Sequence, residues 1–380
     1  MVVNRRHFLA SSLGYLTLLG WPRAGFTNVK SGRLVVILLE GGMDGLAAVP
    51  PIGDMALFDQ RRELVPKNLL EVDRHFALNP ALKNFNMLLK SSFGSIVHAT
   101  NMPYKRRSHF EGQNIMESGI STPFAVKTGW LGRALDLAGL SGESLSLNLP
   151  LLLRGNRGND TYYPAKIKKT DGPDPMIARY LANARSGMVS ETFESLYFKE
   201  NINSRRARRD PISLAKHAAA ALRKVGGPRA AVIKVKRFDT HANQGADSGV
   251  FFSRMRLVDN IFETLRVKLE EDWETTIVVT LTEFGRTVAV NGSLGTDHGY
   301  GSAGLLAGGD GFKEKVVTDW PGLKKTDLHD GRDLMATVDY RSVLSSCLEK
   351  AFGLPHDFII EKVFFDPKIP RLTHRIFLRA

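Results

Sequence analysis

The sequence has almost no cysteine and no long uninterrupted apolar run. Cys347 is the only cysteine among 380 residues, which excludes an internal disulfide and any metal site built on several thiolates. The apolar stretch from Leu9 to Trp21 is short and contains Gly and Ser, so it is not expected to form a stable membrane span. A metal bound by this chain would therefore be held by carboxylate oxygens and imidazole nitrogens.

Two other signatures are missing. The segment Gly41-Gly-Met-Asp-Gly45 lacks the GxGxxG spacing of a dinucleotide-binding turn. The net charge is +13, but the basic clusters at 105–107, 166–169 and 205–209 contain no interleaved aromatic residues, which argues against a nucleic-acid role. We expect these clusters to be solvated loops on a basic surface that attracts anions, including phosphate esters, acidic polymers and anionic lipid.

The N-terminus resembles an export signal. Asn4-Arg-Arg-His-Phe-Leu9 has the pattern of a twin-arginine signal, and the short apolar stretch follows it. We predict that residues 1–30 are this signal segment and that the chain reaches the periplasm or the extracellular space through the twin-arginine translocation machinery. That route carries folded proteins, often with their metal or cofactor in place.

Alternating strand and helix patterns predict an α/β fold with a doubly wound, mostly parallel sheet and helices on both faces. We expect a single domain over 31–380, with an irregular insertion or cap around 156–204. Strands are predicted at 33–39, 95–100, 145–153, 230–235, 276–281 and 304–308. Helices are predicted at 79–89, 108–118, 211–224, 250–271 and 339–352.

Acid and imidazole residues follow several of these strands, where an open α/β sheet places its ligands. The candidate metal ligands are Asp44, Asp239, His241, Glu283, Asp297 and His298. Asp239 and His241 are two positions apart at a strand end, so both side chains can reach one metal. This set suits Zn, Mn or Mg, as one ion or as two ions about 4 Å apart.

Several candidates also have a purely structural interpretation. Asp44 can cap the next helix, and the loop with Asp239 can be a solvated turn. Glu283 and Arg286 can form a structural ion pair, and Asp297 can either bind the metal or orient His298. Arg286 is also a candidate for holding a substrate oxyanion.

The segment Arg106-Arg-Ser-His-Phe-Glu111 offers a nucleophile. Ser108 stands at a predicted helix start, where backbone N–H groups favour an anion. Beside a metal its hydroxyl can attack phosphorus or sulfur, with Arg107 on the substrate. The alternative is an ordinary capping serine that forms a capping box with Glu111. His109 and Glu111 are alternative ligands or acid/base groups.

The combined motifs resemble the DUF1501 family of exported bacterial proteins, within the alkaline phosphatase-like superfamily. The likeness covers nearly the whole mature chain. It rests on Gly-Gly-Met-Asp-Gly-Leu46, Arg-Ser-His-Phe-Glu111, Phe-Asp-Thr-His241, Thr-Glu-Phe-Gly-Arg286, Gly-Thr-Asp-His-Gly299, Asp330-Gly-Arg-Asp-Leu334 and Asp339-Tyr-Arg341.

The resemblance implies an alkaline phosphatase-like sheet with a metal site at the strand ends. It matches Asp44 to the first ligand of the superfamily, Ser108 to the nucleophile and His298 to the late histidine ligand. Asp239 and His241 correspond to an Asp–His pair with shorter spacing. Phe284 stands where the superfamily has a histidine after the carboxylate, here Glu283.

We therefore predict an exported, metal-dependent hydrolase of phosphate or sulfate esters that uses Ser108 as nucleophile and acts on an anionic small molecule or polymer. The alternative is a non-catalytic envelope protein that keeps the fold and binds a partner or acidic polymer through its basic surface.

Overall fold

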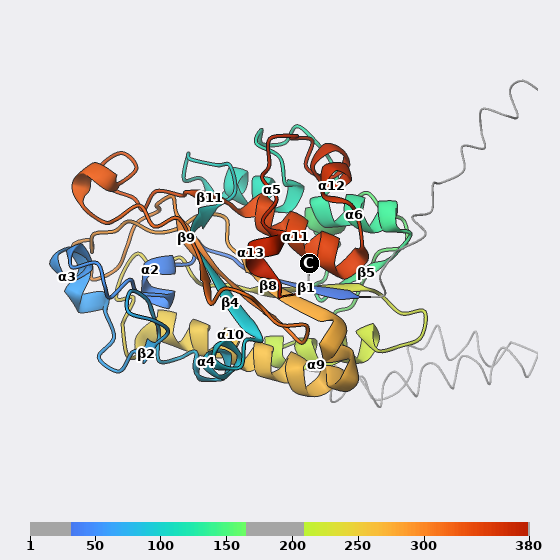
Figure 1. The fold of residues 1–380 in the computed structure, drawn as a ribbon, viewed down its shortest axis with the longest axis horizontal. Coiled ribbons are helices and arrows are strands. Elements are labelled where there is room, and N and C mark those ends of the chain that lie inside the picture. Colours follow the sequence, from blue (N-terminus) through green and yellow to red (C-terminus); the bar gives the residue numbers. More distant parts are fainter. Residues whose placement is uncertain (1–31, 165–208, 379–380) are drawn as a thin grey trace, which may run out of the picture.

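The computed structural model describes residues 32–164 and 209–378. A nine-stranded sheet lies at its centre in the order β10-β4-β9-β8-β1-β7-β5-β6, with β11 paired to β4 (Figure 1). Its strands are β1 (Arg33–Leu39), β4 (Gly94–Asn101), β5 (Gly142–Ser144), β6 (Asp160–Thr161), β7 (Ala230–Val235), β8 (Thr276–Leu281), β9 (Ser302–Gly308), β10 (Val316–Val317) and β11 (Val338–Asp339). A separate pair is formed by β2 (Leu70–Glu71) and β3 (Ala77–Leu78).

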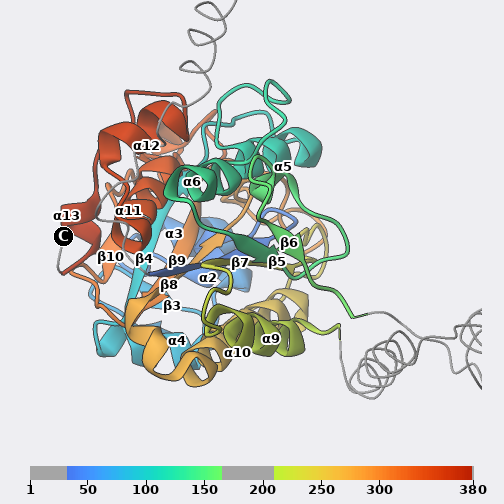
Figure 2. The ribbon, with the colours of Figure 1, turned by 90° about the vertical axis from the view of Figure 1, so that its right-hand side faces the viewer.

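Helices cover both faces of the sheet (Figure 2). One face carries α5 (His109–Ser118), α6 (Trp130–Ala138), α11 (Tyr340–Phe352), α12 (His356–Lys362) and α13 (Thr373–Ile376). The other carries α4 (Lys83–Lys90), α9 (Pro211–Leu222) and α10 (Gly249–Leu269). The short helices α2 (Gly45–Ala48) and α3 (Ala56–Arg61) follow β1, and 3₁₀ turns lie at Arg62–Leu64, Leu151–Leu153, Glu270–Thr275 and Lys325–Asp327.

The central strand β1 is apolar at every position from Leu34 to Leu39. Leu34, Val36 and Leu38 belong to the core under α11, whereas Val35 and Ile37 belong to the core under α10. Successive side chains of a strand point to opposite faces. A strand covered by helices on both sides therefore needs an apolar residue at every position.

The predicted doubly wound, mostly parallel sheet is confirmed, with one antiparallel member. β1 runs parallel to β7 and β8, but β9 is antiparallel to both β4 and β8. The carboxyl ends of the parallel strands therefore share one edge with the start of β9. Loops from all of these strands meet at that edge.

Two predicted elements are wrong. The stretch 145–153 is not a strand, because β5 ends at Ser144 and Leu151–Leu153 forms a 3₁₀ turn whose buried leucines pack on the core. The helix predicted from Asn79 begins at Lys83 instead. The Asn79 side chain accepts a hydrogen bond from the Ala81 N–H at 3.0 Å and so stabilises a turn before the helix.

The predicted signal segment and most of the predicted insertion lie outside the described residues. Among the residues of 32–164 and 209–378, no helix combines the length and apolarity needed to cross a membrane.

Candidate metal centre

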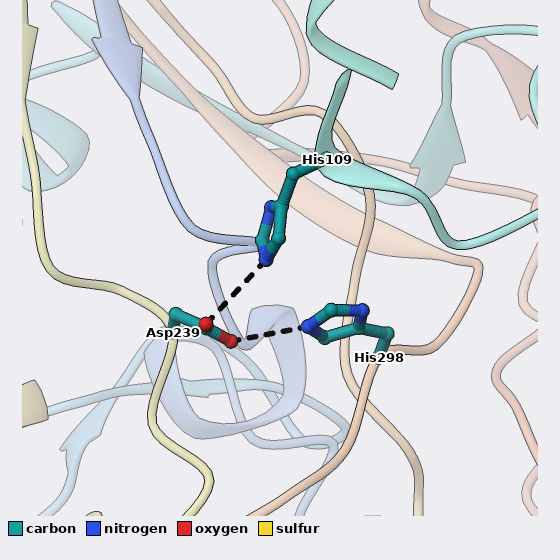
Figure 3. A group of neighbouring side chains, drawn as sticks. All are labelled: His109, Asp239 and His298. Atoms are coloured by element: carbon teal, nitrogen blue, oxygen red, sulfur yellow. Dashed lines mark hydrogen bonds and ion pairs between the residues drawn. The ribbon is translucent and has the colours of Figure 1, made fainter. Parts of the chain in front are cut away.

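Side chains from two loops and from the start of a helix meet at the carboxyl edge of the sheet (Figure 3). His109 begins α5 beyond β4, Asp239 follows β7, and His298 precedes β9. One ligand atom from each of these residues lies within 4.8 Å of the other two. The structure thus brings together three of the residues that the sequence singled out, from positions far apart in the chain.

The His109 ring is oriented by a buried carboxylate. Its Nδ1 lies 2.9 Å from Oε1 of Glu283, and because a carboxylate only accepts, Nδ1 carries the proton. Nε2 of the ring therefore faces Asp239, whose Oδ2 is 3.5 Å away. This Nε2 is buried and has no hydrogen-bond partner among the described residues. The hydrogen bond to Glu283 raises the pKa of His109, against the effect of burial.

His298 is oriented in the same sense by a backbone carbonyl. Its Nδ1 lies 2.9 Å from the carbonyl oxygen of Arg107, which again fixes the proton on Nδ1. Its Nε2 is 3.2 Å from Oδ1 of Asp239. Burial lowers the pKa of His298, which favours the neutral ring that binds metals.

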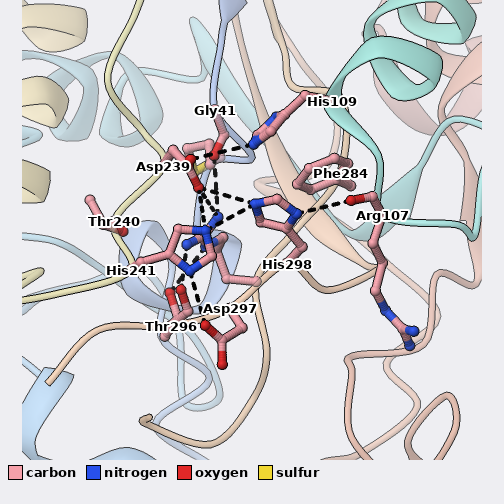
Figure 4. Close-up of polar contacts among 12 residues, drawn as sticks. Gly41, Arg107, His109, Asp239, Thr240, His241, Phe284, Thr296, Asp297 and His298 are labelled. Carbon is pink, nitrogen blue, oxygen red and sulfur yellow. Dashed lines mark hydrogen bonds and ion pairs between the residues drawn. The ribbon is translucent and has the colours of Figure 1, made fainter. Parts of the chain in front are cut away.

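His241 supplies a further imidazole (Figure 4). Its Nδ1 is 2.9 Å from Oδ1 of Asp297, so this carboxylate orients the ring. Its Nε2 lies 3.0 Å from Oδ1 of Asp239 and 3.1 Å from Nε2 of His298. The hydrogen bond to His241 lowers the pKa of Asp297.

Asp239 is held from behind by a buried arginine. Nη1 of Arg286 donates to Oδ1 of Asp239 at 2.8 Å, and the Arg286 side chain is almost completely buried. Burial acts to raise the pKa of Asp239, but the hydrogen bond and charge of Arg286 outweigh it and lower that pKa. The carboxylate is thus kept ionised and oriented by Arg286, whose side chain is buried beneath it.

Glu283 supports the centre from its interior side. Its Oε1 accepts from the Gly41 N–H at 2.8 Å, from His109 at 2.9 Å and from Nε2 of Gln113 at 3.3 Å. Burial acts to raise the pKa of Glu283, but the hydrogen bond with His109 and those from backbone N–H groups, including Gly41, outweigh it and lower that pKa. Its contacts are those of a carboxylate that orients an imidazole ligand.

Asp44 is the predicted ligand that the structure separates from the others. It is 1% exposed, caps α2 through the Ala47 N–H, and forms a buried ion pair with Arg61. Gln244 donates to its Oδ2 at 2.7 Å. These donors occupy both oxygens, so we do not place Asp44 in the candidate centre.

Arg107 and Ser108 flank His109. The guanidinium of Arg107 turns away from the imidazoles (Figure 4) and pairs with Asp333 and Asp330 at 2.6 and 3.0 Å. Ser108 is the N-cap of α5 and is half-buried, but its side chain makes no capping hydrogen bond. The predicted capping box is not formed, since Glu111 accepts from the hydroxyl of Tyr104 instead.

Phe284 forms an apolar wall beside two of the imidazoles. Its ring centroid lies 4.9 Å from that of His109 and 4.8 Å from that of His298. The side chain is fully buried. Phe284 therefore restricts where the two rings can lie, although it offers no ligand atom itself.

Sequence reasoning did not identify Arg61 or Gln113 as neighbours of the candidate residues. Both contact carboxylates that the sequence had flagged, Asp44 and Glu283. No local motif marks either residue, because each contact joins segments brought together only by the fold. Gln244, which also contacts Asp44, lies in the same loop as Asp239, five residues further along the chain.

Comparison with solved structures finds distant likenesses. The C-terminal periplasmic domain of EcEptC from Escherichia coli, in complex with Zn, is 11% identical, with a TM-score of 0.41 over 90% of each chain. The PsFucS1 sulfatase from Pseudoalteromonas sp. is 13% identical, with a TM-score of 0.41 over 97% of this chain and 78% of that one. A protein in the alkaline phosphatase superfamily from Vibrio parahaemolyticus is 12% identical, with a TM-score of 0.34 over 77% of this chain and 65% of that one.

These likenesses are too distant to assign residue roles, so the residues of the centre are identified from their own geometry. No curated protein sequence matches the chain significantly. A family profile described as "Protein of unknown function (DUF1501)" matches residues 173–364, just over half of the 380 residues. The chain belongs to the DUF1501 family.

Proposed function

We propose that this protein binds one divalent metal ion through His109, Asp239, His241 and His298, and that it hydrolyses a phosphate or sulfate ester at this centre. The observation that carries the proposal is the convergence of imidazole Nε2 atoms on Asp239, with each Nδ1 proton directed to an acceptor outside the centre. This arrangement of ligand and orienting partner is characteristic of histidines that bind metal.

The donor set favours zinc among the metals expected from the sequence. Imidazole nitrogens with one carboxylate suit Zn²⁺, whereas Mg²⁺ prefers oxygen ligands. The buried, unpartnered Nε2 of His109 is also the kind of atom that a metal ligand requires. One ion fits better than two, because Asp44 and Glu283 already use their oxygens in other hydrogen bonds.

When bound, the metal would polarise an ester oxygen and favour the ionised form of a nearby hydroxyl. Ser108 directly precedes the ligand His109, and its side chain is not engaged in capping α5. In the proposed reaction the Ser108 oxygen forms a bond to phosphorus or sulfur, and the alcohol of the ester leaves with a proton. Water then cleaves the serine ester, which releases phosphate or sulfate and restores the hydroxyl.

We assign Arg107 and Arg286 to positioning. Both guanidinium groups are engaged by carboxylates within the chain. The backbone of Arg107 orients His298, and the side chain of Arg286 holds Asp239.

The alternative role, binding a partner through a basic surface, has less support from the described residues. Lys105 lies 5.7 Å from the ring centroid of Tyr300, and Arg106 pairs with Glu111 at 3.3 Å. Arg107 is also paired. This basic cluster is therefore largely occupied by contacts within the chain.

Export remains part of the proposal. The pattern Asn4-Arg-Arg-His-Phe-Leu9 supports recognition by the twin-arginine machinery. Replacing Arg5 and Arg6 together by lysine should leave the protein inside the cytoplasm, measured by cell fractionation. Unchanged export of the double variant would contradict this route.

The hydrolase proposal is tested by metal analysis and turnover together. The purified protein should contain about one zinc per chain and should cleave an aryl phosphate or an aryl sulfate. Ser108→Ala should abolish turnover but retain the metal. Ser213→Ala, in α9 on the other side of the sheet, is the matched control and should behave like the wild type. A metal-free protein, or a Ser108→Ala variant with full activity, would contradict the proposal.

A further inference from the structure

A buried chain of hydrogen bonds links α3 to the candidate metal centre. We call it the buried relay, and it ends at Asp239. Its other members are at most 1% exposed and are Arg61, Asp44, Gln244, Thr296 and Arg286. Asp44 follows β1, and Arg61 is the last residue of α3. Gln244 lies in the loop after β7, and both Thr296 and Arg286 lie between β8 and β9. The relay therefore joins segments that are far apart in the sequence.

The first half of the buried relay surrounds the carboxylate of Asp44. Nη1 of Arg61 donates to Oδ1 at 3.1 Å, and Nη2 donates to Oδ2. Nε2 of Gln244 donates to Oδ2 at 2.7 Å. A buried charge is costly unless it is paired and hydrogen-bonded, and Asp44 is both.

The second half runs from Gln244 to the metal centre. Oε1 of Gln244 accepts from Oγ1 of Thr296 at 2.8 Å and from Oγ1 of Thr240 at 2.7 Å. Oγ1 of Thr296 in turn accepts from Nε of Arg286 at 3.2 Å. Nη1 of Arg286 then donates to Asp239 at 2.8 Å.

The negative charge of Asp44 determines which group donates and which accepts in each later hydrogen bond of the buried relay. An ionised carboxylate can only accept, so Gln244 must turn its NH₂ group toward Asp44. Its carbonyl oxygen then faces Thr296, which must donate its only proton there. The remaining lone pairs of that hydroxyl are consequently available to Arg286. Reversing the Gln244 amide would disturb each later contact.

We propose that Asp44, Gln244 and Thr296 act as positioning residues: through Arg286 they hold Asp239 in the orientation that binds the metal. This inference rests on the proposed function, because it assumes a metal at the centre. It also gives Asp44 a role different from the ligand role that the sequence suggested. A network that only stabilised the fold would leave metal affinity unchanged when it was broken.

The direct test is Gln244→Glu, which keeps the side-chain shape but places a carboxylate against Asp44. We expect the dissociation constant for Zn²⁺ to rise by about 10- to 100-fold, as is typical when groups that support metal ligands are lost. Affinity is measured by competition with a chelator, at a temperature where the variant is folded. The visible spectrum with Co²⁺ should also change, since it reports the ligand geometry.

Two further variants keep the test decisive if Gln244→Glu folds poorly. Thr296→Val removes only the hydroxyl and should weaken Zn²⁺ binding in the same direction. The double variant Asp44→Asn with Gln244→Glu exchanges the carboxylate and the amide between these two positions. The new amide can then donate to the new carboxylate, which still accepts from Thr296, so the double variant should recover part of the lost Zn²⁺ affinity.

Asp259→Asn is the matched control. Asp259 is 2% exposed and accepts from the N–H groups of Asn84 and Phe85 at 3.1 and 2.8 Å, away from the centre. Its replacement should lower the melting temperature and leave Zn²⁺ affinity within about twofold of the wild type. Wild-type protein that binds no Zn²⁺ overturns the proposed function. Wild-type binding with equal affinity in Gln244→Glu and Thr296→Val overturns the buried relay alone.

Discussion

The Nε2 atoms of His241 and His298 lie 3.1 Å apart. Each ring has its Nδ1 directed to an acceptor, Asp297 in one case and the Arg107 carbonyl in the other. Both Nε2 atoms also lie close to Oδ1 of Asp239, at 3.0 Å from His241 and 3.2 Å from His298. A cation shared by the two nitrogens and this carboxylate would give all three atoms a common partner. The stability of the folded protein should consequently depend on metal.

Zinc should raise the melting temperature, and a chelator should lower it. A ligand at a free concentration one hundred times its dissociation constant stabilises the folded state by about 2.7 kcal/mol. We expect a shift of several degrees in a thermal scan, with a concentration dependence that follows binding. A melting temperature that is identical with excess zinc and with chelator would rule out a metal at these residues.

Glu283→Gln should weaken zinc binding without removing a ligand. The carboxylate of Glu283 orients His109 through the bond at 2.9 Å, and the loss of such a partner typically costs 10- to 100-fold in metal affinity. Zinc affinity is measured by chelator competition. Glu111→Gln serves as control, because Glu111 bonds to Tyr104 and not to an imidazole. Equal affinity in both variants would show that Glu283 does not support the centre.

Gly42→Ala should destabilise the fold through Phe284. A Cβ at Gly42 would lie 2.5 Å from Cε2 of Phe284, and Gly42 has a φ of +70°. Overpacking and backbone strain together should cost about 2–4 kcal/mol in the free energy of unfolding. Gly139→Ala is the control, since Gly139 has a φ of +66° and nothing within 4 Å of the added Cβ.

Denaturation by urea measures both glycine variants. Backbone strain alone should cost Gly139→Ala about 1–2 kcal/mol. If both variants lose the same free energy of unfolding, contact with Phe284 contributes nothing, and this explanation of Gly42 is wrong.

The buried imidazole of His98 should make stability fall in acid. Its Nε2 lies 2.8 Å from the carbonyl oxygen of Val49, and its Nδ1 accepts from the Ala99 N–H at 2.7 Å, which only a neutral ring allows. Burial lowers the pKa of His98 to about 4. The contribution of His98 to stability is therefore complete above pH 6.5, which is about its pKa in the unfolded chain. This contribution is lost as the pH falls toward about 4.

The difference between the pKa of His98 in the unfolded chain and its pKa in the folded protein corresponds to about 3 kcal/mol of unfolding free energy. His98→Gln cannot titrate, so its stability should fall less between pH 6.5 and 4 than that of the wild type. Urea unfolding with a chelator present isolates this effect from metal binding. Parallel stability curves for the two proteins would show that His98 is not the acid-sensitive group.

The fold was largely predictable because its signals are local. The apolar run of β1 and the helical spacing of Met255, Val258 and Ile261 each specify an element without reference to the rest of the chain. The failure at 145–153 has the opposite cause. Leu152 and Leu153 are apolar because they pack on a distant core, and their local backbone forms a 3₁₀ turn.

The candidate site was only partly predictable. Position at a strand end indicated that Asp239 and His298 belong to one site, and the structure places them together. The same argument applied equally to Asp44, whose carboxylate is instead paired with Arg61. Strand ends determine which loops meet, but they do not determine which side chain a carboxylate faces.

By itself, the sequence determined the family, the layered α/β architecture and the chemical type of the candidate ligands, because composition, periodicity and motifs are properties of neighbouring residues. Only the tertiary structure separated ligand candidates from their supports. Glu283 orients His109 and Arg286 holds Asp239, and these roles depend on distances between atoms more than 40 positions apart. Such distances are set by how the β4, β7 and β8 loops pack against the start of β9, and that packing is not encoded in any one segment.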